Sequence, residues 1–563
     1  MPTTKSCKSC SQNFTIEDLD KAFYTKIKVP EPTHCPECRL QRRIVFRNER
    51  NLFRRQCDLC KNQIVSTFDA DTPFQVYCPD CWWSDKWDTE KYGRDFDFSR
   101  PFFEQFEDLM RVVPKASVLQ LNNENSTYNA LVAYSKNTYM SPGSYFMQDC
   151  FYCRKSQYCK DCVNNNLIDH CELVASSVNC KECYNGHHLI NCRSCSDCAY
   201  VADSSASQYC FMCAGIANGK FQIKNLQYGQ EEYKRLVAEY MNKNPEDLMR
   251  EFQEFSVTIP KKYQNQLNCE NSSGDYIQSC KNAIECYDCF DLEDCKYMIE
   301  TVNAKDSMDL SMHDKDIELC YECSSGGESN KNLKFTYCTI ASPNSEYLYS
   351  CFYLADSFGC DGIHARSQYQ ILNKKYSEAD YKLLRQKIID HMTRTGEYGE
   401  FFPINTSPYP YNQTLAQDYF PLTREQALAK GYKWKEQDPK QYSQATAQIP
   451  YAIEQTPDSI TQEILACKTC GRNYRIIAQE LNLYKKFHLP VPRKCPECRY
   501  SDLLSLKNPR YLYERQCGKC GIAIQTTYAP NRPEKVYCEK CYLGTVYGDE
   551  YGILNTEYWK KDI

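Results

Sequence analysis

The sequence predicts a multidomain, β-rich α+β fold in which a duplicated cysteine module at each end flanks two cysteine-rich, β-solenoid-like units with short helices. Four CxxC pairs recur at identical spacing near both ends of the 563-residue chain. The middle holds a second duplication, because residues 213–236 match residues 360–384 with one residue inserted. Cysteines there often recur nine residues apart in short segments with few helix signals, which is typical of stacked strands.

The two terminal modules align without a gap, and each cysteine of the second lies 460 residues after its counterpart. More than a third of the aligned positions are identical. Residues 16–27 and 476–487 carry apolar side chains at helical spacing, and Pro30 ends the first of these helices. The segments QIVSTF and VYC, with AIQTTY and VYC in the second copy, predict strands around the third and fourth CxxC pairs.

The 38 cysteines indicate metal ligation rather than disulfides. The chain opens without the basic and apolar pattern of a signal peptide, and no apolar run reaches the length of a membrane helix. We therefore expect a cytoplasmic protein with no membrane partner, in which CxxC pairs bind zinc in modules of the zinc-ribbon or treble-clef type. We expect about four zinc ions per chain as cofactors, in closed structural sites.

Sequential pairing of the CxxC motifs is the simplest assignment, although spacing alone leaves an interleaved pairing open. Redox-active dithiols are the less favoured interpretation, because no βαβ pattern surrounds any CxxC pair. The predicted metal ligands are Cys7, Cys10, Cys35, Cys38, Cys57, Cys60, Cys78, Cys81, Cys467, Cys470, Cys495, Cys498, Cys517, Cys520, Cys538 and Cys541.

A linking helix is predicted after the first module, with Ser99 as its N-cap and Pro101 in its first turn. Its apolar stripe favours packing on a core over lying on a membrane surface, because acidic residues interrupt it and its polar face is not basic. The stripe consists of Phe102, Phe103, Phe106, Leu109 and Met110.

Repeats and composition divide the rest of the chain. Each cysteine-rich stretch leads into a helix, at 230–252 and 377–394, and we expect solenoid turns of about 18 to 21 residues. A Pro- and Tyr-rich connector contains one short helix between Thr423 and Gly431. The predicted domains are an N-terminal double zinc module (1–98), the linking helix (99–117), solenoid-like unit 1 with its helix (118–262), solenoid-like unit 2 with its helix (263–400), the connector (401–462) and a C-terminal double zinc module (463–550).

The 22 cysteines between the modules have two interpretations. Free cysteine behaves as a small apolar residue, so they can form a ladder of buried thiols inside the solenoid turns. Alternatively, their CxxC pairs can hold further zinc or an iron–sulfur cluster, since two cysteines three apart share a strand face only if a corner lies between them. The irregular gaps favour the thiol ladder and leave metal binding open.

Residues 39–55 contain seven arginines, whereas the matching segment of the second module is much less basic. Such a cluster can bind phosphates, and it can also neutralise the thiolates of the metal sites. Arg39, Arg50 and Arg55 recur in the second module, which favours a structural role for them. The candidates for nucleic-acid contact are the four that do not recur, Arg42, Arg43, Arg47 and Arg54.

The sequence offers little evidence of enzyme activity. No Gly-rich phosphate loop, GxSxG or HExxH motif occurs, so we predict no enzyme activity and identify no small-molecule substrate. The predicted function is a zinc-binding scaffold or adaptor with a protein partner. The alternatives are an RNA- or ribosome-associated zinc-ribbon protein, and a thiol-redox or metal-storage protein.

A CxxC pair, an aromatic residue, a helix ending in FY, a proline and CPECR follow one another in the first module. In this pattern the module resembles the small bacterial "probable zinc-ribbon" domain. The matching residues are Cys7, Cys10, Phe14, Phe23, Tyr24, Pro32 and Cys35 to Arg39, and in the second module Cys467, Cys470, Tyr474, Tyr484, Pro492 and Cys495 to Arg499. Leu483 replaces the Phe there. The whole layout also resembles uncharacterised bacterial proteins with zinc-ribbon modules flanking a Cys-rich repeat region, which implies no known activity.

Overall fold

The structure is a computed structural model that describes residues 1–313, 315–436 and 442–546. The chain forms two compact units, unit 1 of Met1–Leu119 with Asn265–Glu436 and unit 2 of Gln120–Gln264 with Gln437–Ile563. Each unit therefore joins one terminal module to the cysteine-rich stretch that is more distant from it in sequence. Residues 437–441 of the predicted connector and 547–550 of the predicted C-terminal module lie outside the described residues.

The N-terminal module consists of short strands and three helices. Its elements are β1 (Thr3–Ser6), β2 (Asn13–Ile16), α1 (Asp18–Ile27), α2 (Pro36–Ile44), β3 (Phe53–Gln56), β4 (Gln63–Ser66), β5 (Val76–Tyr77) and α3 (Pro79–Trp82). Helix α1 begins with a capping box between Glu17 and Asp20, and its C-cap Lys28 is left-handed just before Pro30. The predicted helix over 16–27 is therefore confirmed with a start two residues later, and β4 and β5 lie where strands were predicted.

The linking helix is α4 (Phe102–Val112), and its apolar stripe lies in the core of unit 1 as predicted. The predicted cap was wrong, because Pro101 rather than Ser99 occupies the N-cap position. The first two amides of the helix donate to the Glu397 carboxylate, at 2.9 and 2.8 Å. A carboxylate brought in from a distant segment therefore satisfies the amides that a capping side chain would otherwise serve.

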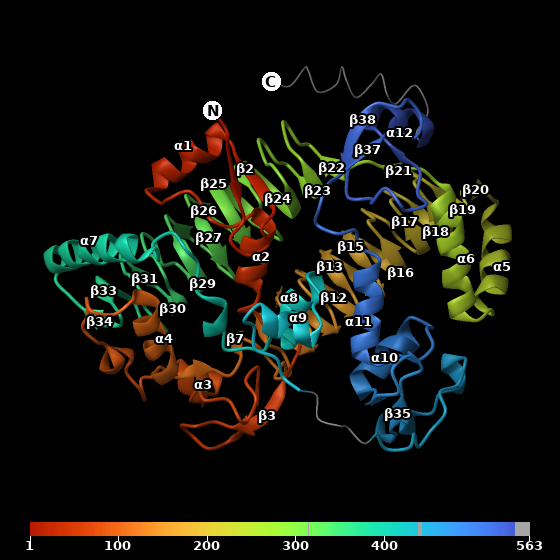
Figure 1. Ribbon diagram of the computed structural model, residues 1–563. Coiled ribbons are helices and arrows are strands. Elements are labelled where there is room, and N and C mark those ends of the chain that lie inside the picture. The colour runs from red at the N-terminus through yellow and green to blue at the C-terminus, as the bar shows by residue number, and fades with distance from the viewer. Residues whose placement is uncertain (314, 437–441, 547–563) are drawn as a thin grey trace. The chain divides into compact units, whose positions relative to one another are not determined.

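Parallel strands form a ladder in unit 1, where they lie side by side (Figure 1). Paired residues are mostly 12 or 13 positions apart, as in Gly274 with Cys286 and Met308 with Tyr321. The ladder consists of β22 (Gln266–Leu267), β23 (Gly274–Gln278), β24 (Cys286–Lys296), β25 (Val302–Ser311), β27 (Tyr321–Ser324), β29 (Lys334–Ile340) and β30 (Tyr349–Phe352), with β26 (Ile317–Glu318) and β28 (Asn330–Lys331) beside it.

Unit 2 holds a second parallel ladder of the same kind (Figure 1). Its paired residues are 12 positions apart, as in Gln148 with Lys160 and Lys160 with Glu172. Its strands are β9 (Lys136–Tyr139), β11 (Gln148–Phe151), β12 (Lys160–Val163), β14 (Glu172–Ala175), β16 (Tyr184–Ile190), β17 (Ala199–Ala202), β18 (Gln208–Ala214) and β19 (Lys220–Ile223), with β13 (Asn166–Asp169) and β15 (Val178–Lys181) beside them and β20 (Leu226–Gln227) antiparallel at the end.

A three-residue backbone repeat underlies the ladder of unit 2. Every third residue from Phe146 to Met212 is left-handed, with φ between 46° and 58°. The residue that follows each of these corners is buried throughout this segment, beginning with Met147, Cys150 and Cys153. Four such triplets make one 12-residue advance, so the expected turn of 18 to 21 residues was wrong. The left-handed corner also supplies the bend that two inward-facing cysteines three residues apart require.

Helices follow both ladders. In unit 1, α7 (Glu378–Thr395) is capped by Ser377 and ends at left-handed Gly396. In unit 2 the single helix predicted over 230–252 is two helices, α5 (Gln230–Met241) and α6 (Pro245–Thr258). The break occurs because Asn244 adopts an extended conformation and caps α6 through the amide of Glu246. The connector helix is α9 (Arg424–Ala429), with the predicted cap at Thr423, and α8 (Leu415–Tyr419) precedes it.

The C-terminal module in unit 2 repeats the order of the N-terminal one. Its elements are β35 (Leu465–Ala466), β36 (Asn473–Tyr474), α10 (Ala478–Lys486), α11 (Pro496–Ser505), β37 (Tyr513–Gln516), β38 (Ala523–Thr526), β39 (Val536–Tyr537) and α12 (Glu539–Val546). In both units the last strand of the module pairs in parallel with a strand that follows a helix: β5 with β6 (Lys115–Ala116), and β39 with β21 (Lys261–Lys262). Within the parts of the chain that the structure describes, no helix has the length and apolarity to cross a bilayer.

Candidate metal centres

Four groups of four cysteines bring all sixteen predicted ligands together. Within each group the sulfur atoms lie within 4.8 Å of one another, and the grouping is sequential. The groups are Cys7, Cys10, Cys35 and Cys38; Cys57, Cys60, Cys78 and Cys81; Cys467, Cys470, Cys495 and Cys498; and Cys517, Cys520, Cys538 and Cys541. They lie on corresponding elements of the two modules.

The spacing of the sulfur atoms fits a tetrahedral metal ion. One Sγ–Sγ distance in each group is 3.7 or 3.8 Å, for example 3.7 Å between Cys10 and Cys35. A zinc ion bonded to four thiolates at about 2.3 Å requires sulfurs about 3.8 Å apart, since a tetrahedron's edge is about 1.63 times its bond length. The residues present therefore match the size and the donor set of a four-thiolate site.

The first CxxC pair of each group lies in the turn of an antiparallel hairpin. In the first group the hairpin is β1–β2, and the amide of Ser11 donates to the Cys7 carbonyl at 2.9 Å. This closure requires a left-handed residue directly after the CxxC pair, and φ is 60° at Ser11 and 76° at Gly521. Lys61 and Gly471 are left-handed at the same place in the other two groups. The second module therefore uses glycine where the first uses strained non-glycine residues.

The second CxxC pair lies at the start of a helix in all four groups, since α12 begins directly after Cys538. Cys35, Cys78 and Cys495 are the N-cap residues of α2, α3 and α11, each followed by a proline. The Cys35 amide donates to the Cys7 sulfur at 3.3 Å, and the same bond joins Cys78 to Cys57. Such bonds favour the charged thiolate that metal binding needs.

The same backbone donors shift the thiol pKa values. At Cys517 burial raises the pKa, but amide groups around the sulfur outweigh it and lower the pKa to about 6. Amide donors likewise outweigh burial and bring the pKa of Cys57 down to about 7 and that of Cys467 to about 6. In each of these three groups the backbone donors therefore favour the thiolate form of one cysteine.

The groups differ in how much solvent reaches them. Three of the four cysteines in the Cys57 group are buried, and its last ligand, Cys81, is followed by Trp82, which is 1% exposed. In the matching Cys517 group only Cys517 is buried, and Cys520 is exposed. The second site of the C-terminal module is therefore the most accessible of the four groups.

The arginine-rich segment docks the N-terminal module onto the ladder of unit 1. Nε of Arg39 donates to Asp309 at 2.9 Å, and Nη1 of Arg43 lies 3.3 Å from the same carboxylate. Glu322 lies beside both, with its pKa raised to about 7 by burial. Arg50 pairs with Asp418 and Arg55 with Asp58, so each of the three recurring arginines has a carboxylate partner within unit 1.

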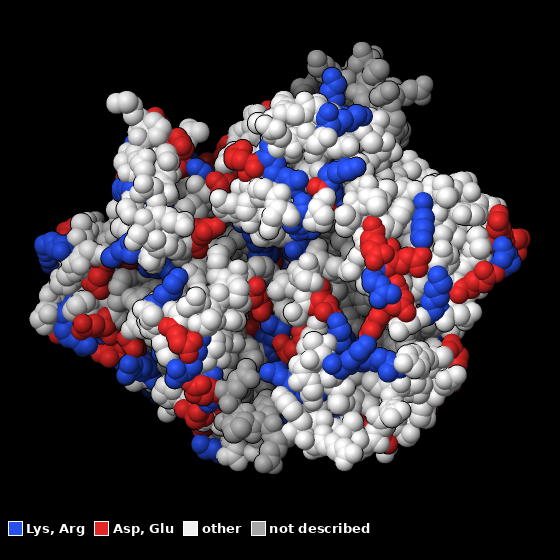
Figure 2. All heavy atoms as spheres, turned by 45° about the vertical axis from the view of Figure 1, so that its right-hand side comes forward, with Lys and Arg blue, Asp and Glu red and all other residues white. Residues whose placement is uncertain are grey.

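The four candidates for nucleic-acid contact differ in burial and in their partners. Arg42 binds Glu400 at 2.9 Å and the Phe401 carbonyl, Arg43 binds Asp309, and Arg47 pairs with Glu49. All three are buried, with exposed fractions of 8, 1 and 3%, whereas Arg54 lies exposed on β3. The structure therefore does not gather the four into one accessible patch. On the face drawn in Figure 2, basic and acidic side chains intermingle.

Unit 2 uses the same docking position with different partners. Arg499, the counterpart of Arg39, donates to Glu480, Asn164 and Tyr484 at 3.0, 2.9 and 2.7 Å. Its guanidinium also lies 4.5 Å from the ring centre of Tyr152. The helix that follows the second CxxC pair thus carries a buried arginine onto the ladder in both units. The sequence did not predict the acceptors of Arg39 and Arg499. The high density of arginines in residues 39–55 was the only sequence feature that pointed to buried ion pairs there.

The internal cysteines line the insides of the ladders, except Cys338, which is a left-handed corner and packs in the main core of unit 1. All except Cys269 are buried, and several donate to backbone carbonyls, as Cys171 does to Cys180 at 3.5 Å. Burial raises the pKa of Cys162 and Cys320 well above the ordinary value. Across the described ranges, no cluster of three or more metal-ligating residues forms outside the four groups. This arrangement supports the thiol-ladder interpretation.

Comparisons with known proteins assign no family. No protein-family model matches the chain, and no curated protein matches it. Among solved structures, a "putative acetyltransferase" from Desulfovibrio desulfuricans G20 is matched at 9% identity over 46% of this chain and 69% of that chain, with a TM-score of 0.10. A TM-score this low carries no argument about fold or activity. The resemblance to the zinc-ribbon domain stays a prediction.

Proposed function

We propose that this protein is a non-enzymatic zinc-binding scaffold or adaptor, in which two zinc-ribbon or treble-clef modules stabilise two β-solenoid-like units. The observation that carries the proposal is the gathering of sixteen sulfurs into four groups of four, each within 4.8 Å and each with one Sγ–Sγ distance of 3.7 or 3.8 Å. Zinc in a four-thiolate site supplies structural cross-linking rather than catalysis, because no coordination position remains for a substrate or water. The free thiols throughout the chain support a reducing compartment such as the cytoplasm.

The docking contacts explain what the zinc would stabilise. In the first metal group of each module, the helix that begins at the second CxxC pair contacts a ladder. In the second metal group, the strand directly before the second CxxC pair forms a parallel pair with the short strand β6 or β21. In unit 1 the path runs from Cys38 through Arg39 to Asp309, and in unit 2 from Cys498 through Arg499 to Asn164. A scaffold of this kind holds two ladder surfaces in place for a protein partner.

Metal analysis with native mass spectrometry tests the proposal. We expect four zinc ions per purified chain and a loss of one when Cys7 and Cys10 are both replaced by serine. The matched control is Cys150→Ser with Cys153→Ser, the same double replacement in a buried internal CxxC pair, which should keep four. Two or fewer tightly held zinc ions, or equal loss in both variants, would contradict the assignment. Cobalt substitution, followed by its visible spectrum, separates tetrahedral thiolate sites from other geometries.

The two alternative functions have less support. Burial of Arg42, Arg43 and Arg47 removes most of the surface on which RNA or ribosome binding was predicted. A thiol-redox or metal-storage role needs reactive internal thiols, whereas all of these except Cys269 are buried. Alkylation of the native, zinc-loaded protein distinguishes this role, because a structural scaffold leaves the internal thiols unlabelled until it unfolds.

A further inference from the structure

A pocket opens in unit 1 at a place where the advance of the ladder changes from 12 to 13 residues. Tyr349 pairs with Asp361, 12 residues later, but β31 (Leu354–Ala355) pairs with β32 (Ser367–Gln368) at a distance of 13. From Ser329 to Gly362 the left-handed corners fall at every third residue, and they resume only at Tyr369. The extra residue therefore lies in the segment 363–368, where it widens one turn of the chain.

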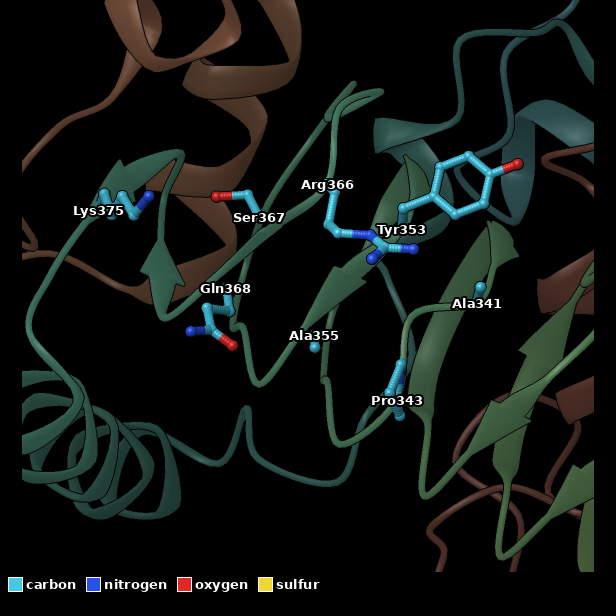
Figure 3. A pocket seen from close by; sticks show the side chains of 8 residues that line it. All are labelled: Ala341, Pro343, Tyr353, Ala355, Arg366, Ser367, Gln368 and Lys375. Atoms are coloured by element: carbon cyan, nitrogen blue, oxygen red, sulfur yellow. The ribbon is translucent and has the colours of Figure 1, made fainter.

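The pocket has a volume of about 500 Å³ and an apolar floor. Ala341, Pro343 and Ala355 are small, and the ring of Tyr353 stands 42% exposed at one side (Figure 3). Figure 3 also shows the charged ends of Arg366 and Lys375 on either side of Ser367. The remaining lining residues are Ser367 and Gln368.

The two cations of the pocket are not neutralised by the protein. No Asp or Glu lines the pocket, and neither Arg366 nor Lys375 forms an ion pair with any residue that the structure describes. Nearby cations behave differently, since Lys374 pairs with Asp95 at 2.6 Å and Arg385 with Glu346 at 2.7 Å. The pocket thus combines uncompensated positive charge with an apolar floor.

Ser367 adds a hydrogen-bond donor to this charge. Its Oγ accepts a hydrogen bond from Nε2 of Gln370 at 2.8 Å, so its hydroxyl hydrogen points elsewhere. Among the described residues no acceptor for that hydrogen is recorded. A hydroxyl, a guanidinium and an ammonium together form the donor set that carboxylates and phosphates prefer.

We propose that this pocket binds a small organic anion. Its carboxylate or phosphate would bind Arg366, Lys375 and the Ser367 hydroxyl, and its flat apolar body would cover Ala355 and contact the Tyr353 ring. Arginine offers a planar fork that matches either anion, whereas lysine contributes a point charge. A few converging polar groups over an apolar floor are typical of ligand sites. This binding is independent of the zinc sites and goes beyond a scaffold role.

Saturation-transfer NMR and calorimetry on the full zinc-loaded chain test the proposal with phenyl phosphate, benzoate and inorganic phosphate as probes. We expect phenyl phosphate or benzoate to bind, and the stronger of the two identifies the anion class. The variant Arg366→Gln with Lys375→Gln should weaken binding at least tenfold. The matched control is Lys305→Gln with Lys331→Gln, which removes the same charge from exposed ion pairs of the same ladder and should leave binding unchanged.

A second variant separates the two parts of the pocket. Tyr353→Ala should weaken phenyl phosphate more than inorganic phosphate, because only the former has a ring to contact Tyr353. No binding of either organic probe, or equal weakening in the pocket and control variants, would overturn the proposal. Zinc content is measured on every variant, so a failure here with four zinc ions retained leaves the proposed scaffold function intact.

Discussion

Arg39 donates from Nε to the carboxylate of Asp309 at 2.9 Å, and the two side chains are 2 and 0% exposed. The residues are 270 positions apart, and Arg39 directly follows a predicted metal ligand. This bond therefore couples a metal centre to the ladder of unit 1. Because the pair is buried, removing one partner leaves an unpaired charge in the core and strongly destabilises the protein. The intact pair itself adds little net stability, because burying both charges costs desolvation free energy.

We predict that Arg39→Met lowers the free energy of unfolding by about 3–5 kcal/mol, because it leaves the Asp309 carboxylate buried with fewer partners. Urea unfolding followed by circular dichroism measures this. The control is Lys305→Met, which removes an exposed ion pair with Glu293 and should cost less than about 1 kcal/mol. Equal effects of the two variants would show that the arginine does not dock the module.

Glu322 should make stability depend on pH. Burial raises its pKa from 4.5 to about 7, so the folded protein holds this proton more tightly than the unfolded chain does. That contribution favours folding at low pH and is lost as the pH rises from about 4.5 to 7. Relative to Glu322→Gln, the wild type should therefore lose about 1–3 kcal/mol of stability across this window.

Urea midpoints of both proteins at pH 5, 6, 7 and 8 measure the difference. Glu318→Gln is the control, because the Glu318 side chain is only partly buried and Lys331 lowers its pKa, which places its titration below the window. A wild-type difference from Glu322→Gln that stays constant with pH would contradict the raised pKa.

The four metal groups should release zinc in an order set by exposure. The Cys517 group, with one buried ligand, should lose its metal to a chelator first, and the Cys57 group, with three, should lose it last. Release into a chromogenic chelator is followed over time. Replacing Cys517 and Cys520 by serine should remove the fastest phase, and replacing Cys57 and Cys60 should remove the slowest. The opposite assignment would show that ligand burial does not control release.

The three-residue backbone repeat predicts that substitutions at two neighbouring residues have opposite effects on stability. Leu167 is a half-buried left-handed corner with φ of 58°, and Ile168 is buried inside the ladder. Leu167→Asn should stabilise by up to about 1 kcal/mol, because Asn accepts the left-handed region more readily. Ile168→Asn should destabilise by more than about 2 kcal/mol, since it buries an unpaired polar group. Thermal melts of the two variants are compared, and similar effects would mean that the corners are misplaced.

The sequence could predict the local elements around the cysteines well. Three short-range patterns carried this information: the CxxC spacing, the proline after the first cysteine of the second CxxC pair, and the helical period of residues 16–27. The hairpins, the helix N-termini and α1 follow from these patterns, because each depends on only a few neighbouring residues. It could not predict the length of the ladder turn. A left-handed corner is expected of Gly, Asn or Asp, but here Tyr158 and Leu167 adopt it because ladder pairing and an inward neighbour offset its cost.

The sequence by itself therefore determined the sixteen thiols, their arrangement in CxxC pairs and the duplication of the modules, because these rest on short-range spacing, whereas the sequential grouping of the pairs came from the structure. The tertiary structure decided which ladder each module joins and what its arginines bind. Asp309 and Glu400 meet Arg39 and Arg42 only after some 270 to 360 intervening residues have folded. Charge partners at such separations leave no periodic signal in one sequence, so burial and ion pairing could be read only from the folded chain.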